Sequence, residues 1–310
     1  MSDTVIGVDL GGTRVKAGLV AGETLAEVMV ERVSDKSPAG IVATLSALVT
    51  RLDPSGRAAV GLAAAGVLDI EAGLVRESPN FPEWKDFALG AELAAATGRK
   101  VVLENDANAV ILGEARHGAA RGRRSVIGYT LGTGVGGGLV LDGRLYRGER
   151  GMAGELGHVT VEREGRPCGC GNRGCLERYA GQRGLHESAL EDPVLVPHLP
   201  SVDDPRDTPR TLMALSVRED EVGLAARRVY ASAGRYLGQA VAALVHTLDV
   251  TTIVLAGGIA QAFPLIAPAM EHELRERTFR SMAQGVVILA GTLDTHAGLH
   301  GAAAVARELG

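Results

Sequence analysis

The sequence predicts an α/β protein built from two related halves. Short apolar runs typical of buried strands alternate with longer segments in which apolar residues recur at helical spacing. The stretch 9–20 resembles the stretch 130–140, and each combines a strand, a glycine-rich turn and a second strand. This repetition indicates a duplicated domain in which each half brings one glycine-rich loop to a shared cleft. Glycine-rich hairpins also recur by chance, so the repetition alone leaves the duplication open.

In the first half, short apolar runs that end at turns predict strands, and apolar residues three and four apart predict helices. The segment 38–52 is expected to be a helix because its apolar residues fall on one face. A second helix is expected at 105–117, directly after a buried strand. The strands of this half are predicted at 4–10, 14–20, 24–31, 58–62 and 101–104.

The second half repeats the alternation and adds one segment of a different character. Strands are predicted at 125–131, 135–141 and 252–255, and helices at 221–247, 261–276 and 297–309. The segment 186–221 contains five of the twelve prolines and a cluster of aspartates, which argues against long regular elements. We expect it to form an irregular insertion or lid within the second domain.

Composition and charge exclude several classes of function. The net charge of −5 argues against binding to nucleic acid or to a membrane surface, because an acidic field repels both. The longest uncharged run, 125–141, carries six glycines, so it fits two strands and a loop better than a membrane span. No secretory signal precedes the first predicted strand. We therefore expect a cytoplasmic protein.

The cysteines are the most specific feature of the chain. All three, Cys168, Cys170 and Cys175, lie within eight residues, and His158 lies just upstream. Three thiolates and one imidazole make a tetrahedral zinc site of the structural type. The alternatives are a reduced trio that clusters by chance, or a disulfide, which fits poorly because three is an odd number and the spacing is short.

Two glycine turns are candidates for holding phosphate groups. Backbone N–H groups in such turns are accessible because no side chain shields them. Candidates for this role are Gly11, Gly12 and Thr13 in the first half and Gly132, Thr133 and Gly134 in the second. Asp9 ends the first predicted strand and could hold Mg²⁺ through water, because Mg²⁺ gives up its hydration shell reluctantly.

Asn105 and Asp106 stand where a buried strand meets a helix. These residue types favour the N-cap of a helix, which is the structural interpretation. In the functional interpretation, Asp106 is an ionised carboxylate that accepts a proton from a substrate hydroxyl. The same carboxylate could do both, so the two interpretations are compatible.

A further group of polar residues surrounds the cysteines. Glu155 and His158 are three residues apart, and Glu177 follows the last cysteine by two. Carboxylates and an imidazole held on one rigid patch suit a polyol such as a sugar, whose hydroxyls need fixed acceptors. Without the neighbouring cysteines, Glu177 would be interpreted as a solvated charge at the start of a helix.

Taken together, these motifs resemble the ROK family of bacterial sugar kinases, and within it the zinc-containing glucokinases. The resemblance extends from the first strand to the last helix. It rests on the motifs at 9–13, 78–84, 104–108, 131–138, 154–158 and 168–177, on Gly257-Gly258 and on the helix at 298–304. The order of the motifs along the chain makes the resemblance specific.

The resemblance implies an actin-like, ribonuclease-H-like fold of two α/β domains with a cleft between them. The smaller domain would comprise 1–118 and 297–310, and the larger 119–296, with the zinc motif at 158–177 and the proline-rich insertion at 186–221. It also implies an ATP-dependent kinase that uses Mg²⁺, contains structural zinc and phosphorylates the 6-hydroxyl of glucose. A homodimer or tetramer is the family expectation for its assembly.

The resemblance assigns roles to the candidate residues. Asp106 would be the catalytic base, and zinc would be bound by His158, Cys168, Cys170 and Cys175. The sugar would be bound by Gly66, Asn105, Asp106, Glu155, His158 and Glu177. The nucleotide and its Mg²⁺ would be held by Asp9, Gly11, Gly12, Thr13, Gly132, Thr133 and Gly134, with Gly257 and Gly258 near the adenosine.

The alternatives concern mainly the acceptor and the donor. Kinases for N-acetylmannosamine, N-acetylglucosamine, mannose or fructose share these motifs, and some relatives use polyphosphate. A sugar-responsive repressor is disfavoured because the first strand begins by Thr4 and leaves no room for a helix-turn-helix domain. Two features depart from the family pattern: Arg14 stands where Lys is common, and 186–221 matches no family motif.

Overall fold

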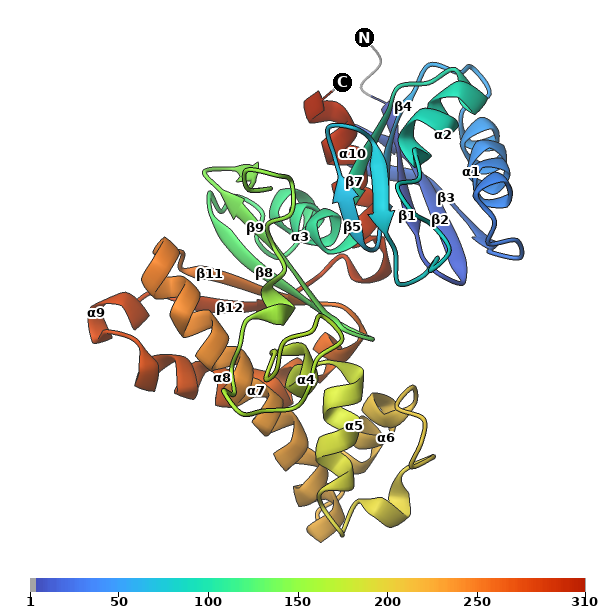
Figure 1. The fold of residues 1–310 in the computed structure, drawn as a ribbon. Helices are drawn as coiled ribbons and strands as arrows, with labels where there is room; N and C mark the ends of the chain where they lie inside the picture. The colour runs from blue at the N-terminus through green and yellow to red at the C-terminus, as the bar shows by residue number, and fades with distance from the viewer. Residues whose placement is uncertain (1–3, 310) are drawn as a thin grey trace. The chain divides into compact units, whose positions relative to one another are not determined.

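The computed structural model describes residues 4–309, and contacts within the chain divide it into two compact units (Figure 1). The first unit runs to Arg124 and also includes Gly138–Gly154 and the chain from Thr292 onward. The second comprises Ser125–Gly137 and Glu155–Gly291. The larger domain implied by the resemblance includes 138–154, whereas contacts within the chain group this stretch with the first unit. Residues 138–141 and 144–145 within it are nevertheless strands of the second sheet.

A five-stranded mixed sheet forms the centre of the first unit. Its strand order is β3-β2-β1-β4-β7, in which β1–β3 are antiparallel and β4 and β7 run parallel to β1. The strands are β1 (Thr4–Leu10), β2 (Arg14–Ala21), β3 (Thr24–Arg32), β4 (Ala59–Ala64) and β7 (Val101–Asn105). The turns that carry Gly12 and Asn105 thus follow the carboxyl ends of β1 and β7, where parallel strands present ligand sites.

Helices cover both faces of this sheet (Figure 1). The covering helices are α1 (Pro38–Leu52), α2 (Leu89–Thr97), α3 (Asp106–His117) and α10 (Ala297–Leu309). Alternate residues of β1 point to opposite faces, so Ile6 packs in the core with α1 while Val5 packs with α10. A Cβ on Gly61 would lie 1.8 Å from Ala302 O, so glycine allows α10 to lie directly on the sheet.

A second five-stranded sheet has the order β10-β9-β8-β11-β12. Its strands are β8 (Val126–Leu131), β9 (Val135–Leu141), β10 (Arg144–Leu145), β11 (Thr252–Ala256) and β12 (Val287–Ala290). The helices of the second unit are α4 (Glu177–Ala180), α5 (Gln182–Leu190), α6 (Thr208–Ser216), α7 (Glu221–Leu248), α8 (Phe263–Arg277) and α9 (Arg280–Ala283). Short 3₁₀ segments include Leu156–His158 and Gly258–Ala262.

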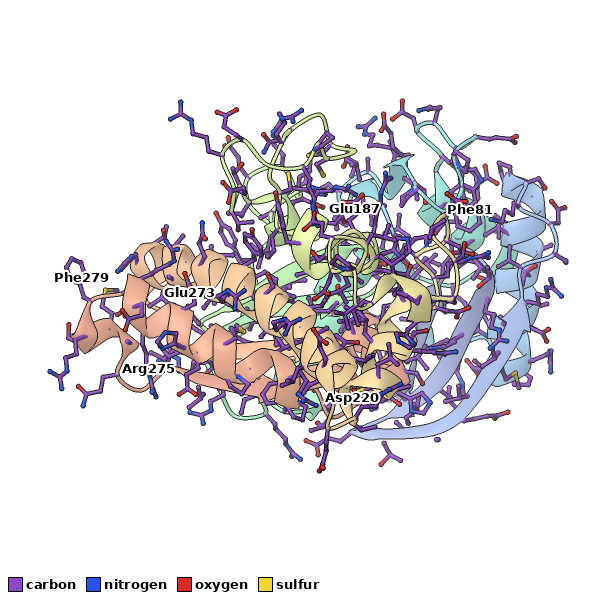
Figure 2. All side chains as sticks on the ribbon, turned by 90° about the horizontal axis from the view of Figure 1, so that it is seen from below. Phe81, Glu187, Asp220, Glu273, Arg275 and Phe279 are labelled. Atoms are coloured by element: carbon purple, nitrogen blue, oxygen red, sulfur yellow. The ribbon has the colours of Figure 1, made fainter. Side chains whose placement is uncertain are left out.

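The long helices α7 and α8 pack against each other through glycine. A Cβ on Gly234 would lie 2.4 Å from Ile266 O, so the two backbones approach closely there. Asp220 caps α7 by accepting a hydrogen bond from Gly223 N–H at 3.1 Å, and it lies at the opposite end of the pair from Phe279 (Figure 2). Within residues 4–309, no helix combines the length and apolarity that a membrane span requires.

Most predicted elements are confirmed to within a few residues, including the strands around both glycine turns. The expectation for 186–221 was wrong in part, because α5 extends to Leu190 and α6 forms a regular helix. Pro209 lies at the start of α6, where proline stabilises a helix instead of breaking it. The sequence also did not predict α2, β12 or the hairpin of β5 (Val67–Asp69) and β6 (Leu74–Glu77).

Candidate functional site

The turn from β7 into α3 places the predicted base at the first position of a helix. The Asn105 side chain is the N-cap and accepts hydrogen bonds from Ala107 N–H at 2.9 Å and Asn108 N–H at 3.2 Å. Asp106 Oδ1 also accepts from Ala107 N–H at 2.9 Å. Capping is thus done mainly by Asn105.

Asn105 also contacts a second predicted sugar ligand. Its Nδ2 donates a hydrogen bond to Gly66 O at 3.3 Å, which is possible because β4 and β7 are paired near Ala64 and Asn105. Gly66 has a φ of +128°, and a Cβ there would lie 2.1 Å from Glu77 O. Only glycine fits this position. The structure therefore brings Gly66 and Asn105 together.

A buried ion pair lies behind this turn, and sequence reasoning gave its members no role. The side chain of Glu104 is 1 % exposed, and its Oε2 accepts a hydrogen bond from Arg147 Nε at 2.7 Å. Its Oε1 accepts from Asn105 N–H and from Asn108 Nδ2, both at 3.0 Å. Glu104 therefore connects Arg147, which follows β10, to the turn that carries the predicted base.

Replacing Arg147 with methionine is expected to lower the free energy of unfolding by about 3 kcal/mol, because the Glu104 carboxylate would stay buried without its cation. Urea denaturation measures this change. Arg144→Met, at an exposed residue of β10, is the matched control and should change little. Adding Glu104→Gln to Arg147→Met should recover part of the loss, and a double variant less stable than Arg147→Met would contradict the pairing.

The first glycine turn carries the predicted metal-linked aspartate. Asp9 pairs with Lys16 across β1 and β2. Burial raises the pKa of Asp9, and the Lys16 ammonium acts against this rise. A nearby cation would favour the ionised carboxylate, so Asp9 is suited to hold Mg²⁺. Because it is a single carboxylate, most other ligands would have to be water or phosphate oxygens.

The turn at Gly12 approaches another loop closely. A Cβ on Gly12 would lie 2.8 Å from Asn80 Oδ1, so a larger residue would displace Asn80. The Gly11 N–H donates a hydrogen bond to Arg14 O at 3.0 Å, and Thr13 O accepts one from Val33 N–H at 2.9 Å. Thr13 itself is exposed, so its hydroxyl can reach a ligand.

The second glycine turn lies between β8 and β9. The Gly132 N–H donates to Gly134 O at 3.0 Å, and Gly132 O accepts from Gln182 N–H at 3.0 Å. Thr133 is exposed at the tip of the turn. Gly257, with a φ of +89°, lies beside the start of this turn, because a Cβ there would lie 2.5 Å from Leu131 O. The turn at 132–134 and Gly257, both predicted to bind the nucleotide, are therefore neighbours.

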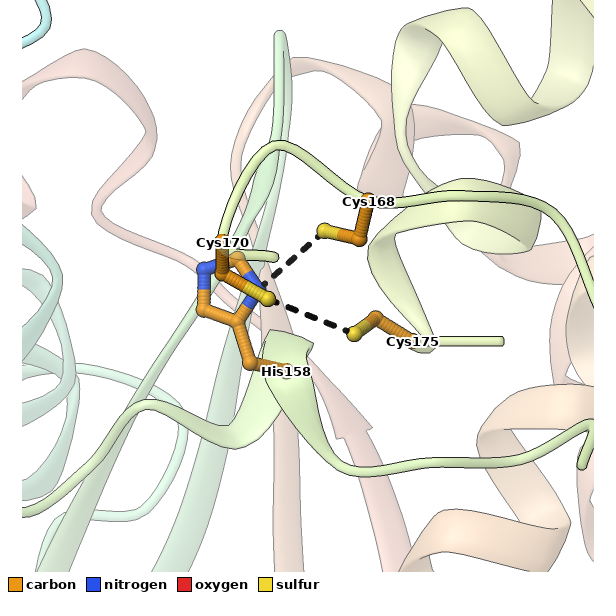
Figure 3. Close-up of side chains that lie close together, drawn as sticks. All are labelled: His158, Cys168, Cys170 and Cys175. Atoms are coloured by element: carbon orange, nitrogen blue, oxygen red, sulfur yellow. Dashed lines mark hydrogen bonds between the residues drawn. The ribbon is translucent and has the colours of Figure 1, made fainter. Parts of the chain in front are cut away.

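The four predicted zinc ligands meet in one cluster (Figure 3). Their ligand atoms all lie within 4.8 Å of one another. A tetrahedral zinc ion with bonds of about 2.3 Å to sulfur and 2.0–2.1 Å to nitrogen requires S···S edges of about 3.8 Å and N···S edges of about 3.6 Å. Cys170 Sγ and Cys175 Sγ are 3.7 Å apart, and His158 Nδ1 and Cys168 Sγ are 3.5 Å apart. The cluster fits zinc.

The pKa values of the cysteine thiols differ within the cluster, and a thiol with a raised pKa must lose its proton before it can bind a metal ion. Burial raises the pKa of the Cys175 thiol to about 12. A hydrogen bond from the Asn172 backbone lowers the pKa of Cys170. Zinc binding requires thiolates, so the bound ion would have to displace the proton of Cys175.

The predicted sugar ligands of the second unit surround this cluster. His158 directs Nδ1 toward Cys168, and its Nε2 lies 3.9 Å from Glu155 Oε2. The side chain of Glu155 is 58 % exposed, so its carboxylate is accessible to a ligand. Glu177 is half-buried, and its Oε2 accepts a hydrogen bond from Val135 N–H at 3.2 Å. Glu177 is therefore not the solvated helix-start charge that the structural interpretation suggests.

Comparison with known proteins gives consistent matches over the whole chain. A family model described as the ROK family matches residues 5–309. A glucokinase from Thermotoga maritima is 35% identical over 98% of this chain and 97% of its own length. The structure is also similar to the crystal structure of a ROK hexokinase from Thermus thermophilus, with a TM-score of 0.81 and 37% sequence identity. The match covers 99% of this chain and 100% of that one.

A third relative was crystallised with ligands. It is a ROK family glucokinase from Streptomyces griseus in complex with glucose and AMPPNP, 32% identical, with a TM-score of 0.80 and coverage of 98% of this chain and 99% of that one. The agreement with these structures confirms the predicted fold class, the actin-like fold of two α/β domains.

Proposed function

The chain belongs to the ROK family, and we propose that it is a glucokinase, which transfers the terminal phosphoryl group of ATP to the 6-hydroxyl of glucose. The main support is the match over nearly the whole chain to a glucokinase crystallised with glucose and an ATP analogue. The local geometry fits this reaction, because each unit contains a glycine turn suited to phosphate groups and polar side chains suited to a sugar.

In the proposed reaction, Asp106 acts as the general base. Its carboxylate accepts the proton of the sugar 6-hydroxyl as the oxygen attacks the phosphoryl group. Asn105 and Gly66 O hold the turn and contact the sugar, and the Glu104–Arg147 pair supports the turn from behind. Phosphoryl transfer depends mainly on alignment and charge stabilisation, so a rigid base is the main contribution of this part of the chain.

The phosphate groups of ATP are held by the two glycine turns in this proposal. Gly11, Gly12 and Thr13 serve one end of the phosphate chain, and Gly132, Thr133 and Gly134 the other. Gly257 and Gly258 contact the adenosine. Asp9 would hold Mg²⁺ through water, and the ion would neutralise charge on the transferred group.

The sugar is held in the second unit by Glu155, His158 and Glu177. We assign zinc a structural role, because a closed set of one histidine and three cysteines leaves no open position for substrate. With Nδ1 on the metal, His158 keeps Nε2 for a sugar hydroxyl or for Glu155. The proposed enzyme is cytoplasmic and homo-oligomeric, and its partners are the sugar and the nucleotide.

A comparison of acceptors and donors tests this function. ADP release is measured with ATP-Mg²⁺ and glucose, mannose, fructose, N-acetylglucosamine or N-acetylmannosamine, and kcat/KM is compared. We expect the highest kcat/KM with glucose. A higher value with another sugar would keep the mechanism but change the substrate, and turnover only with polyphosphate would reject ATP as the donor. No turnover of any sugar with either donor would overturn the proposal.

A further inference from the structure

The glycine turn between β8 and β9 is held by the segment that joins α4 to α5. Gln182 N–H donates to Gly132 O at 3.0 Å, on one side of the turn. On the other side, Glu177 Oε2 accepts from Val135 N–H at 3.2 Å. Between these two bonds, a Cβ on Gly181 would lie 3.4 Å from Gly134 C, so the turn and the segment 177–182 are in close contact. The turn is thus attached at both ends to residues 177–182.

Of these two hydrogen bonds, the one to Glu177 brings a charged side chain directly against the turn. A Cβ on Gly134 would lie 2.3 Å from Glu177 Oε2, so the carboxylate lies directly against the turn and a larger residue there would displace it. Its bond to Val135 N–H fixes the peptide group that follows Gly134. Because Gly132 N–H already donates to Gly134 O, the amides that the turn can offer to a phosphate are those of Thr133 and Gly134.

Backbone hydrogen bonds beside the predicted zinc ligands hold Glu177 in place. Glu177 follows the ligand Cys175 by two residues, and Arg178 N–H donates to Cys175 O at 2.9 Å. Leu176, between them, is fully buried, and its N–H donates to Val159 O at 3.0 Å, directly after the ligand His158. The start of α4 is therefore fixed from both sides by chain segments that carry zinc ligands.

We propose that Glu177 is a positioning residue for the nucleotide as well as a ligand of the sugar. Its carboxylate holds the peptide after Gly134, so that the amides of Thr133 and Gly134 are presented to a nucleotide phosphate. One residue next to the metal cluster thereby serves both substrates. This inference rests on the proposed function, in which this turn binds phosphate.

Nucleotide binding in the absence of sugar tests the inference, because sugar contacts then play no part. The dissociation constant of ADP-Mg²⁺ is measured by titration calorimetry for the wild type and variants. Glu177→Ala is expected to weaken binding roughly tenfold, since it removes an ionised hydrogen-bond acceptor. Glu177→Gln keeps a side-chain oxygen for Val135 N–H, so it should restore binding to within about threefold of the wild type.

Glu164→Ala is the matched control. Glu164 is also a carboxylate in the loop between the ligands His158 and Cys168, but its side chain is 87 % exposed and lies 3.6 Å from Arg163 Nε. This variant should bind ADP-Mg²⁺ like the wild type. If Glu177→Ala fails to fold, as judged by circular dichroism, Glu177→Asp replaces it, because its carboxylate is one methylene too short to reach Val135 N–H.

The outcomes separate the inference from the function on which it rests. Failure of the wild type to bind ADP-Mg²⁺ would count against the kinase proposal and the inference alike. Tight binding by both the wild type and Glu177→Ala would overturn the inference and leave the kinase intact. Equal weakening by Glu177→Ala and Glu177→Gln would also overturn it, because the charge and not the hydrogen bond to Val135 would then be responsible.

Discussion

Replacing Asp106 with asparagine is expected to lower kcat for glucose phosphorylation about a thousandfold, within the range that a general base contributes. The amide cannot accept the proton of the 6-hydroxyl at neutral pH. The KM for glucose should change little, because the amide can still form a hydrogen bond with that hydroxyl. Steady-state kinetics of ADP release, with glucose and ATP-Mg²⁺ both varied, measures the two constants separately.

The control for this variant is Asp142→Asn. Asp142 has a positive φ of 51°, which asparagine tolerates, and its side chain is 80 % exposed and paired with Arg124. Its replacement should leave kcat unchanged. If Asp106→Asn retained more than about a tenth of the wild-type kcat, the loss would fall below the contribution of a general base, and the assignment of Asp106 would be wrong.

Replacing Cys170 with serine is expected to release zinc and to lower the melting temperature by roughly 6 °C. A metal present at a thousand times its dissociation constant contributes about 4 kcal/mol. With an unfolding entropy of about 2.1 cal/mol/K per residue, each kcal/mol corresponds to about 1.5 °C in a chain of 310 residues. Cys170 is exposed, so the substitution removes little packing, and the loss of stability would come from the metal. Differential scanning calorimetry and elemental analysis measure the two changes.

Asn172→Ser serves as the control within the same loop. Asn172 donates a hydrogen bond to Thr160 Oγ1 at 2.9 Å but is not part of the ligand cluster, so zinc content should be retained. Chelation of zinc from the wild type should lower the melting temperature by about the same amount as Cys170→Ser. A zinc-free wild type that melts at the same temperature as the zinc-loaded protein would show that the metal has no structural role.

The sequence predicted those features that depend on short stretches of chain. The strands around Gly12 and Gly132 were recognised because apolar runs stop at glycine pairs, and the helix after Asn105 because an N-cap residue precedes an apolar pattern. The cluster of His158 with the three cysteines was predicted for the same reason, since Cys168, Cys170 and Cys175 lie close together in the chain. Local signals of this kind need no knowledge of the tertiary structure.

The features that were missed depend on pairing between distant residues. Arg147 is 43 residues from Glu104, and Val135 is 42 residues from Glu177, so no spacing rule connects either pair. Both glutamates appeared within recognised motifs, yet their partners show only in the folded chain. The helix α6 was missed for a different reason: prolines were counted as helix breakers, although Pro209 stands at a helix start.

The most direct test of the glucokinase proposal is the formation of glucose 6-phosphate from glucose and ATP-Mg²⁺. The product is detected by its oxidation with a glucose 6-phosphate dehydrogenase, and the ADP released is measured in parallel. We expect glucose 6-phosphate and ADP in equal amounts from the wild type, and about a thousandfold slower formation of both by Asp106→Asn. ADP release without glucose 6-phosphate, or no release with active zinc-loaded protein, would contradict the assignment.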